Sequence, residues 1–185
     1  HNQEALAENE LYEKKSGDFL RLYENLGIDI SGFSATGKTS LQSWLPYINN
    51  GQTILSVHNT HTNAADIEFV KLLTGPAMDH YFFCTCINAN LYIENTLPPL
   101  EMLMNKGVQL VVGTDSYASN WQLNVFEELR SIRTHFPQIT WAQCLQWATI
   151  NGARALGMDD QLGSFDRGKK PGIILLNDVK ASRIL

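Results

Sequence analysis

The sequence lacks several features that would place it in common classes of protein. Its 185 residues include only three cysteines, Cys84, Cys86 and Cys144, too few and odd in number for a disulfide framework, which indicates a reducing cytoplasm. No apolar run is long enough to cross a bilayer, and no signal-peptide pattern opens the chain. Basic blocks are absent and the net charge is −5, which argues against a nucleic-acid partner. We therefore expect a cytoplasmic globular protein that binds neither membrane nor nucleic acid.

Two further absences bear on the fold and on the extent of the chain. No G-x-G-x-x-G follows an apolar run, so a dinucleotide-binding fold has no support. The first residue is His1 rather than an initiator methionine, and we expect the chain to be part of a longer protein. A hydrophobic content of 44% with 18% charged residues is typical of a folded domain.

Short apolar runs alternate with helical patterns through the middle of the chain. The runs 53–57, 81–87 and 108–112 are rich in β-branched or aromatic residues and predict buried strands. Helical spacing of apolar residues follows at about 63–73, 100–104 and 123–135, and Thr140 is placed to cap a further helix. This alternation predicts an α/β protein with a parallel sheet, and a barrel and a doubly wound sheet both remain open.

Polar residues follow each predicted strand at the end where α/β proteins place their chemistry. His58 and His61 follow the first strand, Asn88 and Asn90 the second, and Asp115 the third. Each has a plainer interpretation, since Asp115 could cap a helix and His58 could simply pack. The shared position of His58 and Asp115 on their strands favours a site.

His1 and Glu4 stand at the head of a helix that the Ala, Leu and Glu content predicts from Ala5 onward. A histidine three residues before a glutamate suits a metal ligand beside a proton carrier. The alternative is a frayed terminus with an acidic first turn, which the helix dipole favours.

The segment Gly32 to Thr39 matches the phosphate-binding loop pattern G-x-x-x-x-G-K-[ST]. That motif needs a strand before it and a helix after it, and residues 28–30 make a poor strand. A nucleotide-binding protein is therefore the alternative from another class, and a polar loop leading into a short helix is the plainer interpretation.

Several motifs together closely resemble the amidohydrolase superfamily, in its branch of deaminases and chlorohydrolases. The motifs are, in chain order, His1-x-x-Glu4, His58-x-x-His61, Gly113-Thr114-Asp115-Ser116, Ala118-Ser119-Asn120, Thr149-x-Asn151-Gly152-Ala153-x-Ala155-Leu156-Gly157, Gly163-Ser164-Phe165 and Gly168-Lys169-Lys170-Pro171-Gly172. The resemblance implies that residues 1–160 form the C-terminal half of a (β/α)8 barrel, about strands 5 to 8. Residues 161–185, with an apolar strand near 173–176, would belong to a small accessory β-structure.

The resemblance also implies roles for individual residues. His1 and Asp115 are expected as metal ligands, with Asp115 also the base, Glu4 as proton carrier and His58 as the histidine that faces the substrate and holds the attacking water. The expected substrate contacts are His61, Asn88, Asn90 and Ser119. The family's H-x-H ligand pair is absent, so we expect this piece alone to be inactive.

The implied function is metal-dependent hydrolysis of a carbon–nitrogen bond. Deamination of a small heterocycle by metal-activated water is the first expectation, and amide or halide hydrolysis within the same superfamily is the alternative. The expected cofactor is one divalent metal ion, with zinc ahead of iron. The expected partner is a small-molecule substrate, and a homodimer is left open.

Overall fold

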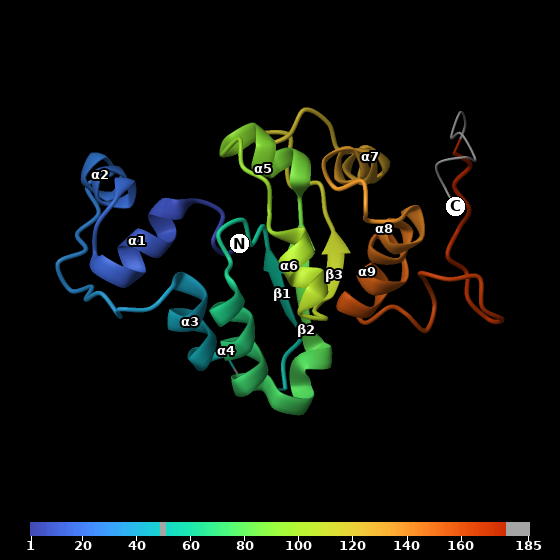
Figure 1. Ribbon diagram of the computed structural model, residues 1–185, viewed down its shortest axis with the longest axis horizontal. Coiled ribbons are helices and arrows are strands. Elements are labelled where there is room, and N and C mark those ends of the chain that lie inside the picture. The colour runs from blue at the N-terminus through green and yellow to red at the C-terminus, as the bar shows by residue number, and fades with distance from the viewer. Residues whose placement is uncertain (49–50, 177–185) are drawn as a thin grey trace.

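A three-stranded parallel sheet lies at the centre of the molecule (Figure 1). The computed structural model describes residues 1–48 and 51–176. Strands β1 (Ile54–Val57), β2 (Tyr81–Thr85) and β3 (Gln109–Val112) lie in the order β1-β2-β3, with Ile54 opposite Tyr81 and Phe82 opposite Gln109. The predicted parallel α/β arrangement is therefore confirmed.

Helices fill every connection between the strands. The α-helices are α1 (Leu6–Lys14), α2 (Asp18–Asn25), α3 (Ser40–Trp44), α4 (Ala64–Thr74), α5 (Ile87–Ile93), α6 (Leu100–Asn105), α7 (Val125–His135), α8 (Trp141–Ala148) and α9 (Ile150–Ala155), with 3₁₀ helices η1 (Leu45–Tyr47) and η2 (Gly75–His80). Figure 1 shows α1 to α3 on one side of the sheet, α7 to α9 on the other, and α5 beyond the arrowheads of the strands.

Side-chain caps fix where the main helices begin. Asn63 and Asp66 form a reciprocal capping box at the start of α4, and Thr140 and Gln143 form another at α8. Asn124 accepts hydrogen bonds from the first turn of α7. The predicted cap at Thr140 is confirmed.

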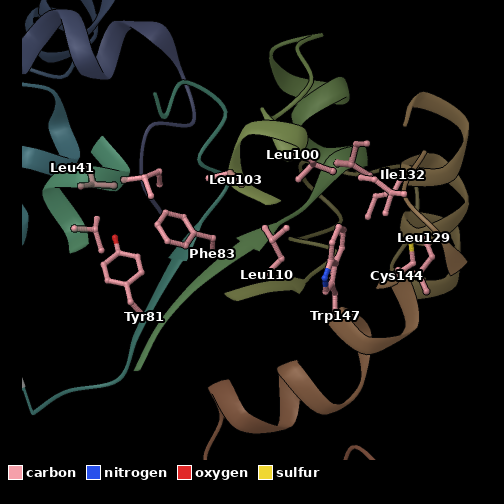
Figure 2. Close-up of a cluster of buried hydrophobic side chains, with 14 of the residues drawn as sticks. Leu41, Tyr81, Phe83, Leu100, Leu103, Leu110, Leu129, Ile132, Cys144 and Trp147 are labelled. Carbon is pink, nitrogen blue, oxygen red and sulfur yellow. The ribbon is translucent and has the colours of Figure 1, made fainter. Parts of the chain in front are cut away.

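Strand β2 is buried on both faces of the sheet, as expected of a parallel strand, whereas Leu55 of β1 is exposed, so the prediction that 53–57 is a buried strand is wrong for β1. On one face Tyr81, Phe83 and Leu110 pack against the helices in the main core, which includes Leu129 and Ile132 of α7 (Figure 2). On the other face a smaller cluster is formed by Phe82, Cys84, Cys86, Ala89 and Val111. Cys84 and Cys86 thus lie in the core as free, buried thiols.

Three predicted boundaries are wrong. Strand β2 stops at Thr85 and α5 begins at Ile87, so Asn88 and Asn90 lie on a helix rather than in a loop. The predicted single helix after Thr140 is two helices, because the backbone of Thr149 (φ −123, ψ −92) breaks the helical path. Residues 173–176 form no strand, since no described neighbour offers them a ladder of hydrogen bonds; residues 177–185 of the predicted accessory segment lie outside the described residues.

The Gly32 to Thr39 segment is a loop, and residues 28–31 before it form no strand. Thr39 caps α3, a helix of five residues, and its hydroxyl donates to Asp66 at 2.5 Å. The Lys38 ammonium lies 5.8 Å from the centre of the Phe69 ring. The plainer interpretation therefore accounts for the motif, and the nucleotide-binding alternative loses its structural support.

In the described part of the chain, no helix is both long and apolar enough to span a membrane.

Candidate functional site

The first residues of the chain lie beside the end of β1. Asn2 forms an isolated parallel bridge with His58: its N–H donates to the Val57 carbonyl at 3.0 Å, and its carbonyl accepts from the Asn59 N–H at 3.0 Å. This pairing brings His1 and Glu4 to the carboxyl end of the sheet, where residues from β1 and β3 already converge.

His1, His58 and Asp115 meet there. One ligand atom from each lies within 4.8 Å of the others. His58 Nε2 and His1 Nδ1 are 3.0 Å apart, and the two rings meet edge to face at 4.5 Å between centroids. His58 is 1% exposed, whereas His1 is open to solvent, so the cluster has a buried wall and an open mouth.

Glu4 borders this cluster. Its Oε1 lies 3.6 Å from His58 Nε2, and its Oε2 lies 3.9 Å from His1 Nδ1. Burial raises the pKa of the Glu4 carboxyl, as does the nearby Asp115 charge, while His58 acts in the opposite direction. A carboxyl group that stays protonated to higher pH than an exposed glutamate suits a group that both gives and accepts a proton.

The orientation of His58 is set by Asn90 on α5. The Asn90 amide donates to Thr60 Oγ1 at 2.9 Å, which turns its carbonyl oxygen toward His58 Nδ1 at 3.0 Å. A carbonyl oxygen can only accept, so His58 Nδ1 carries the proton and its Nε2 presents a lone pair to the cluster. A histidine held in this tautomer is ready to bind a metal or accept a hydrogen bond from water.

Asp115 is held by the loop that follows it. The Ser119 hydroxyl donates to Asp115 Oδ2, and the Asn120 amide donates to the Thr114 carbonyl at 2.7 Å. Just before it, Gly113 lies against two thiols: a Cβ there would come within 3.0 Å of Cys84 Sγ and 3.2 Å of Cys86 Sγ. The close packing under the strand end explains why a glycine precedes the carboxylate.

Unfavourable backbone conformations gather at this site. Among the described residues six non-glycine residues have positive φ, and four of them are Gln3 (49°), His58 (73°), Asn59 (55°) and Asp115 (56°). Such conformations persist only where the surroundings enforce them, and they are commonest at functional sites.

Gln3 shows how this enforcement works. It is fully buried between His1 and Glu4, and its amide donates to Asp66 Oδ2 and to Asn9 Oδ1, each at 3.1 Å. The Oε1 atom of the same side chain accepts from the Thr62 hydroxyl at 2.5 Å. These contacts hold the left-handed turn that directs both His1 and Glu4 toward His58.

The donor set fits a divalent transition metal. Two imidazole nitrogens and a carboxylate oxygen are ligands that zinc takes in proteins, and the tautomer of His58 leaves its Nε2 lone pair facing the other two groups. Chemistry that needs a metal, a nearby acid and a base therefore has its residues in place.

Comparison with known proteins gives the family. The model of the amidohydrolase family matches residues 30–184. The chain belongs to the amidohydrolase family. Among curated relatives, the 5-methylthioadenosine/S-adenosylhomocysteine deaminase of Teredinibacter turnerae is 34% identical over 128 residues, covering 65% of this chain and 28% of that protein. The enzyme of the same name from Thermoanaerobacter pseudethanolicus is 29% identical over 131 residues, covering 66% and 29%.

Solved structures agree with this amidohydrolase assignment. An adenosine deaminase from Xanthomonas campestris, solved with bound zinc, is 25% identical with a TM-score of 0.62 over 91% of this chain and 34% of that one. The fold also matches Helicobacter pylori aminofutalosine deaminase at 24% identity, with a TM-score of 0.75 over 90% of this chain and 40% of that one. The chain thus spans less than half the length of the relatives it matches.

The structure brings together five of the predicted site residues of this amidohydrolase: His1, Glu4, His58, Asp115 and Ser119. Asn90 lies behind His58, fully buried, with its amide occupied by His58 and Thr60.

Asn88 and His61 lie outside this cluster. The Asn88 N–H donates to Glu128 Oε2 at 3.0 Å. The His61 N–H donates to the Gln3 carbonyl at 3.0 Å, while its buried Nε2 has no hydrogen-bond partner in the described part of the chain. The substrate contacts assigned to these two residues stay predictions.

Glu128 is a buried residue that the sequence interpretation missed. It is fully buried on α7, and burial raises the pKa of its carboxyl, although hydrogen bonds from Asn88 and Asn120 oppose the shift. The sequence contains a signal for this residue, because Glu128 lies on the same helical stripe as Val125 and Ile132. A carboxylate buried with an apolar stripe needs hydrogen-bond donors around it.

Proposed function

We propose that this chain is the C-terminal half of a (β/α)8 metal-dependent amidohydrolase and that the whole enzyme deaminates a small heterocycle. Residues 1–160 would supply about strands 5 to 8, and residues 161–185 would belong to an accessory β-structure. The observation that carries the proposal is the convergence of His1, His58 and Asp115 within 4.8 Å, with Glu4 beside them. The similarity to deaminases supports carbon–nitrogen bonds as the target.

In this proposal His1 and Asp115 hold one divalent metal ion, with zinc ahead of iron. The ion supplies Lewis-acid activation of a water molecule. The remaining ligands would come from the rest of the barrel.

The proton steps fall to Asp115, Glu4 and His58. Asp115 accepts a proton from the attacking water, and Glu4 protonates the ring nitrogen next to the amino-bearing carbon. His58, held by Asn90, accepts a hydrogen bond from the attacking water at its Nε2 lone pair and so fixes the position of the water. The water oxygen bonds to the carbon, and its remaining proton passes to Glu4, which restores the proton that Glu4 gave to the ring nitrogen. The carbon–nitrogen bond breaks, a carbonyl forms, and the amino group leaves as ammonia with the proton from Asp115.

Substrate recognition falls to polar groups around this centre. We propose that Ser119, Asn88, Asn90 and His61 line or support the substrate pocket. An amino-substituted purine is the class of substrate that we favour, because the curated relatives deaminate 5-methylthioadenosine and S-adenosylhomocysteine.

The test uses the whole protein that contains this chain. Ammonia release from 5-methylthioadenosine and adenosine is measured together with bound metal by elemental analysis, for the wild type and for Asp115→Ala and Lys38→Ala. We expect activity and bound metal to vanish with Asp115→Ala and to survive Lys38→Ala, since the Lys38 ammonium lies over the Phe69 ring of α4 and is not part of the His1, His58 and Asp115 cluster. Release of chloride from a halogenated heterocycle, without ammonia release, would redirect the proposal to the halide alternative. Active preparations without a bound transition metal would overturn it.

A further inference from the structure

The buried carboxylate of Glu128 connects two loops that carry site residues. Its Oε2 accepts from the backbone N–H of Asn88 at 3.0 Å, and its Oε1 accepts from the Asn120 amide at 2.8 Å. The side chain is 0% exposed, so water cannot replace either contact. Asn88 follows β2, Asn120 follows β3, and Glu128 itself belongs to α7, so one side chain joins three elements.

The contact between Glu128 and Asn88 bears on the position of His58. Asn88 lies in the first turn of α5, and two residues later Asn90 holds His58 Nδ1 at 3.0 Å. The position of this turn therefore decides how far Asn90 reaches and how the His58 ring is aimed.

The contact between Glu128 and Asn120 bears on the position of Asp115. The Asn120 amide donates both to Glu128 and to the Thr114 carbonyl at 2.7 Å, which closes the loop from Thr114 to Asn120. Inside that loop Ser119 donates to Asp115, whose backbone is held at a positive φ of 56°.

We propose that Glu128 is a positioning residue that fixes the separation of His58 and Asp115 through these two contacts. The structural part of this inference stands on the hydrogen bonds, and its catalytic meaning rests on the function proposed above. A group of this kind touches neither metal nor substrate, and groups behind metal ligands typically change metal affinity or activity by about 10- to 100-fold when removed.

The chemistry of the site requires a carboxylate at this position. Both Glu128 oxygens accept, and both partners donate. A glutamine of the same shape has one oxygen and one NH₂ group. Its NH₂ group would therefore lie against a donor, either the Asn88 N–H or the Asn120 amide, and one of the two hydrogen bonds would be lost. Glu128→Gln therefore breaks the connection with almost no change in volume.

The matched control is Glu127→Gln. Glu127 is the neighbouring residue on α7, and it forms a surface ion pair with Arg130 at 3.0 Å. The same substitution there leaves both loops untouched. A third variant, Asn120→Ala, removes the contact of Glu128 with the loop that carries Asp115 and keeps its contact with Asn88.

Hydrogen–deuterium exchange on the whole protein tests the connection without any reference to activity. In Glu128→Gln we expect faster exchange in both 86–93 and 113–120, in Asn120→Ala in 113–120 alone, and in Glu127→Gln in neither. Changes confined to α7 or to one loop in Glu128→Gln would overturn the inference.

Zinc affinity, kcat and KM test the catalytic meaning. We expect Glu128→Gln to lose about 10- to 100-fold in zinc affinity or kcat relative to Glu127→Gln. A lower melting temperature with zinc affinity, kcat and KM equal to those of Glu127→Gln would show a merely structural role and overturn the inference. Wild-type protein that takes up no zinc would overturn the proposed function instead, and the exchange result would still decide whether Glu128 joins the loops.

Discussion

Replacing Asn90 by leucine removes the carbonyl oxygen that accepts from His58 Nδ1 while keeping a side chain of similar size. Asn90 is fully buried on α5, and His58 is 1% exposed, so water has little access to the nitrogen left behind. The His58 ring would keep a buried N–H with no acceptor, or it would change tautomer and lose the lone pair that Nε2 presents to His1 and Asp115.

The size of the expected loss follows from the hydrogen bond between the Asn90 carbonyl oxygen and His58 Nδ1. A buried donor left without a partner costs about 1–3 kcal/mol, which corresponds to roughly 5- to 150-fold in an equilibrium constant. The Thr60 hydroxyl, which accepts from the Asn90 amide at 2.9 Å, can rotate, so we assign it little of this cost. Since the penalty is relieved when His58 changes tautomer or moves, we expect zinc affinity or kcat of the whole enzyme to fall by a factor in that range.

The assay compares Asn90→Leu with Asn90→Asp and Asn105→Leu in the whole protein, using zinc titration, ammonia release and thermal melting. Asn90→Asp keeps an acceptor for His58 and should retain more zinc affinity than Asn90→Leu. Asn105 is an exposed residue at the end of α6 and serves as the control. If Asn90→Leu lowers only the melting temperature and leaves zinc affinity, kcat and KM unchanged, then Asn90 does not orient His58 for function.

Three further predictions concern stability, each measured by equilibrium urea unfolding. Burial raises the pKa of the Glu128 carboxyl in the folded state, so the contribution of Glu128 to the free energy of unfolding should fall as pH rises above about 4.5. The slope of this free energy against pH should therefore be more negative in the wild type than in Glu128→Gln, which cannot ionise; equal slopes would contradict this. Gly113→Ala should lower the free energy of unfolding by about 1–3 kcal/mol, because the added Cβ would lie 3.0 Å from Cys84 Sγ. Adding Cys84→Ala should recover part of this loss, and no recovery would show that the thiol is not the obstacle. Ile132→Ala should lower the free energy of unfolding by about 2–5 kcal/mol, because Ile132 is fully buried. Leu72→Ala, at a residue that is 84% exposed, should change it by no more than about 0.5 kcal/mol. Similar losses in the two variants would contradict the packing of α7.

The local pattern of residues determined the parallel α/β class and the two site residues that follow strands, His58 and Asp115. Apolar runs at β1 and β3 are bounded by polar residues, and the parallel direction of these strands places His58 and Asp115 at the same edge. The start of α8 was also predictable, because the capping box of Thr140 and Gln143 is a local arrangement of neighbouring residues.

The tertiary structure decided what depends on distant partners. Periodicity does not divide the run from Tyr81 to Asn90 between β2 and α5, since it is buried throughout, and so it does not identify Asn90 as the partner of His58. His1 and Glu4 reach the site only because Asn2 pairs with His58, 56 positions further along the chain. Glu128 receives its hydrogen bonds from residues 40 and 8 positions away, and no local pattern contains that information. The sequence therefore determined which groups stand at the strand ends, and only the folded chain decided which side chains hold them in place, because those contacts join segments that approach one another only when the sheet has formed.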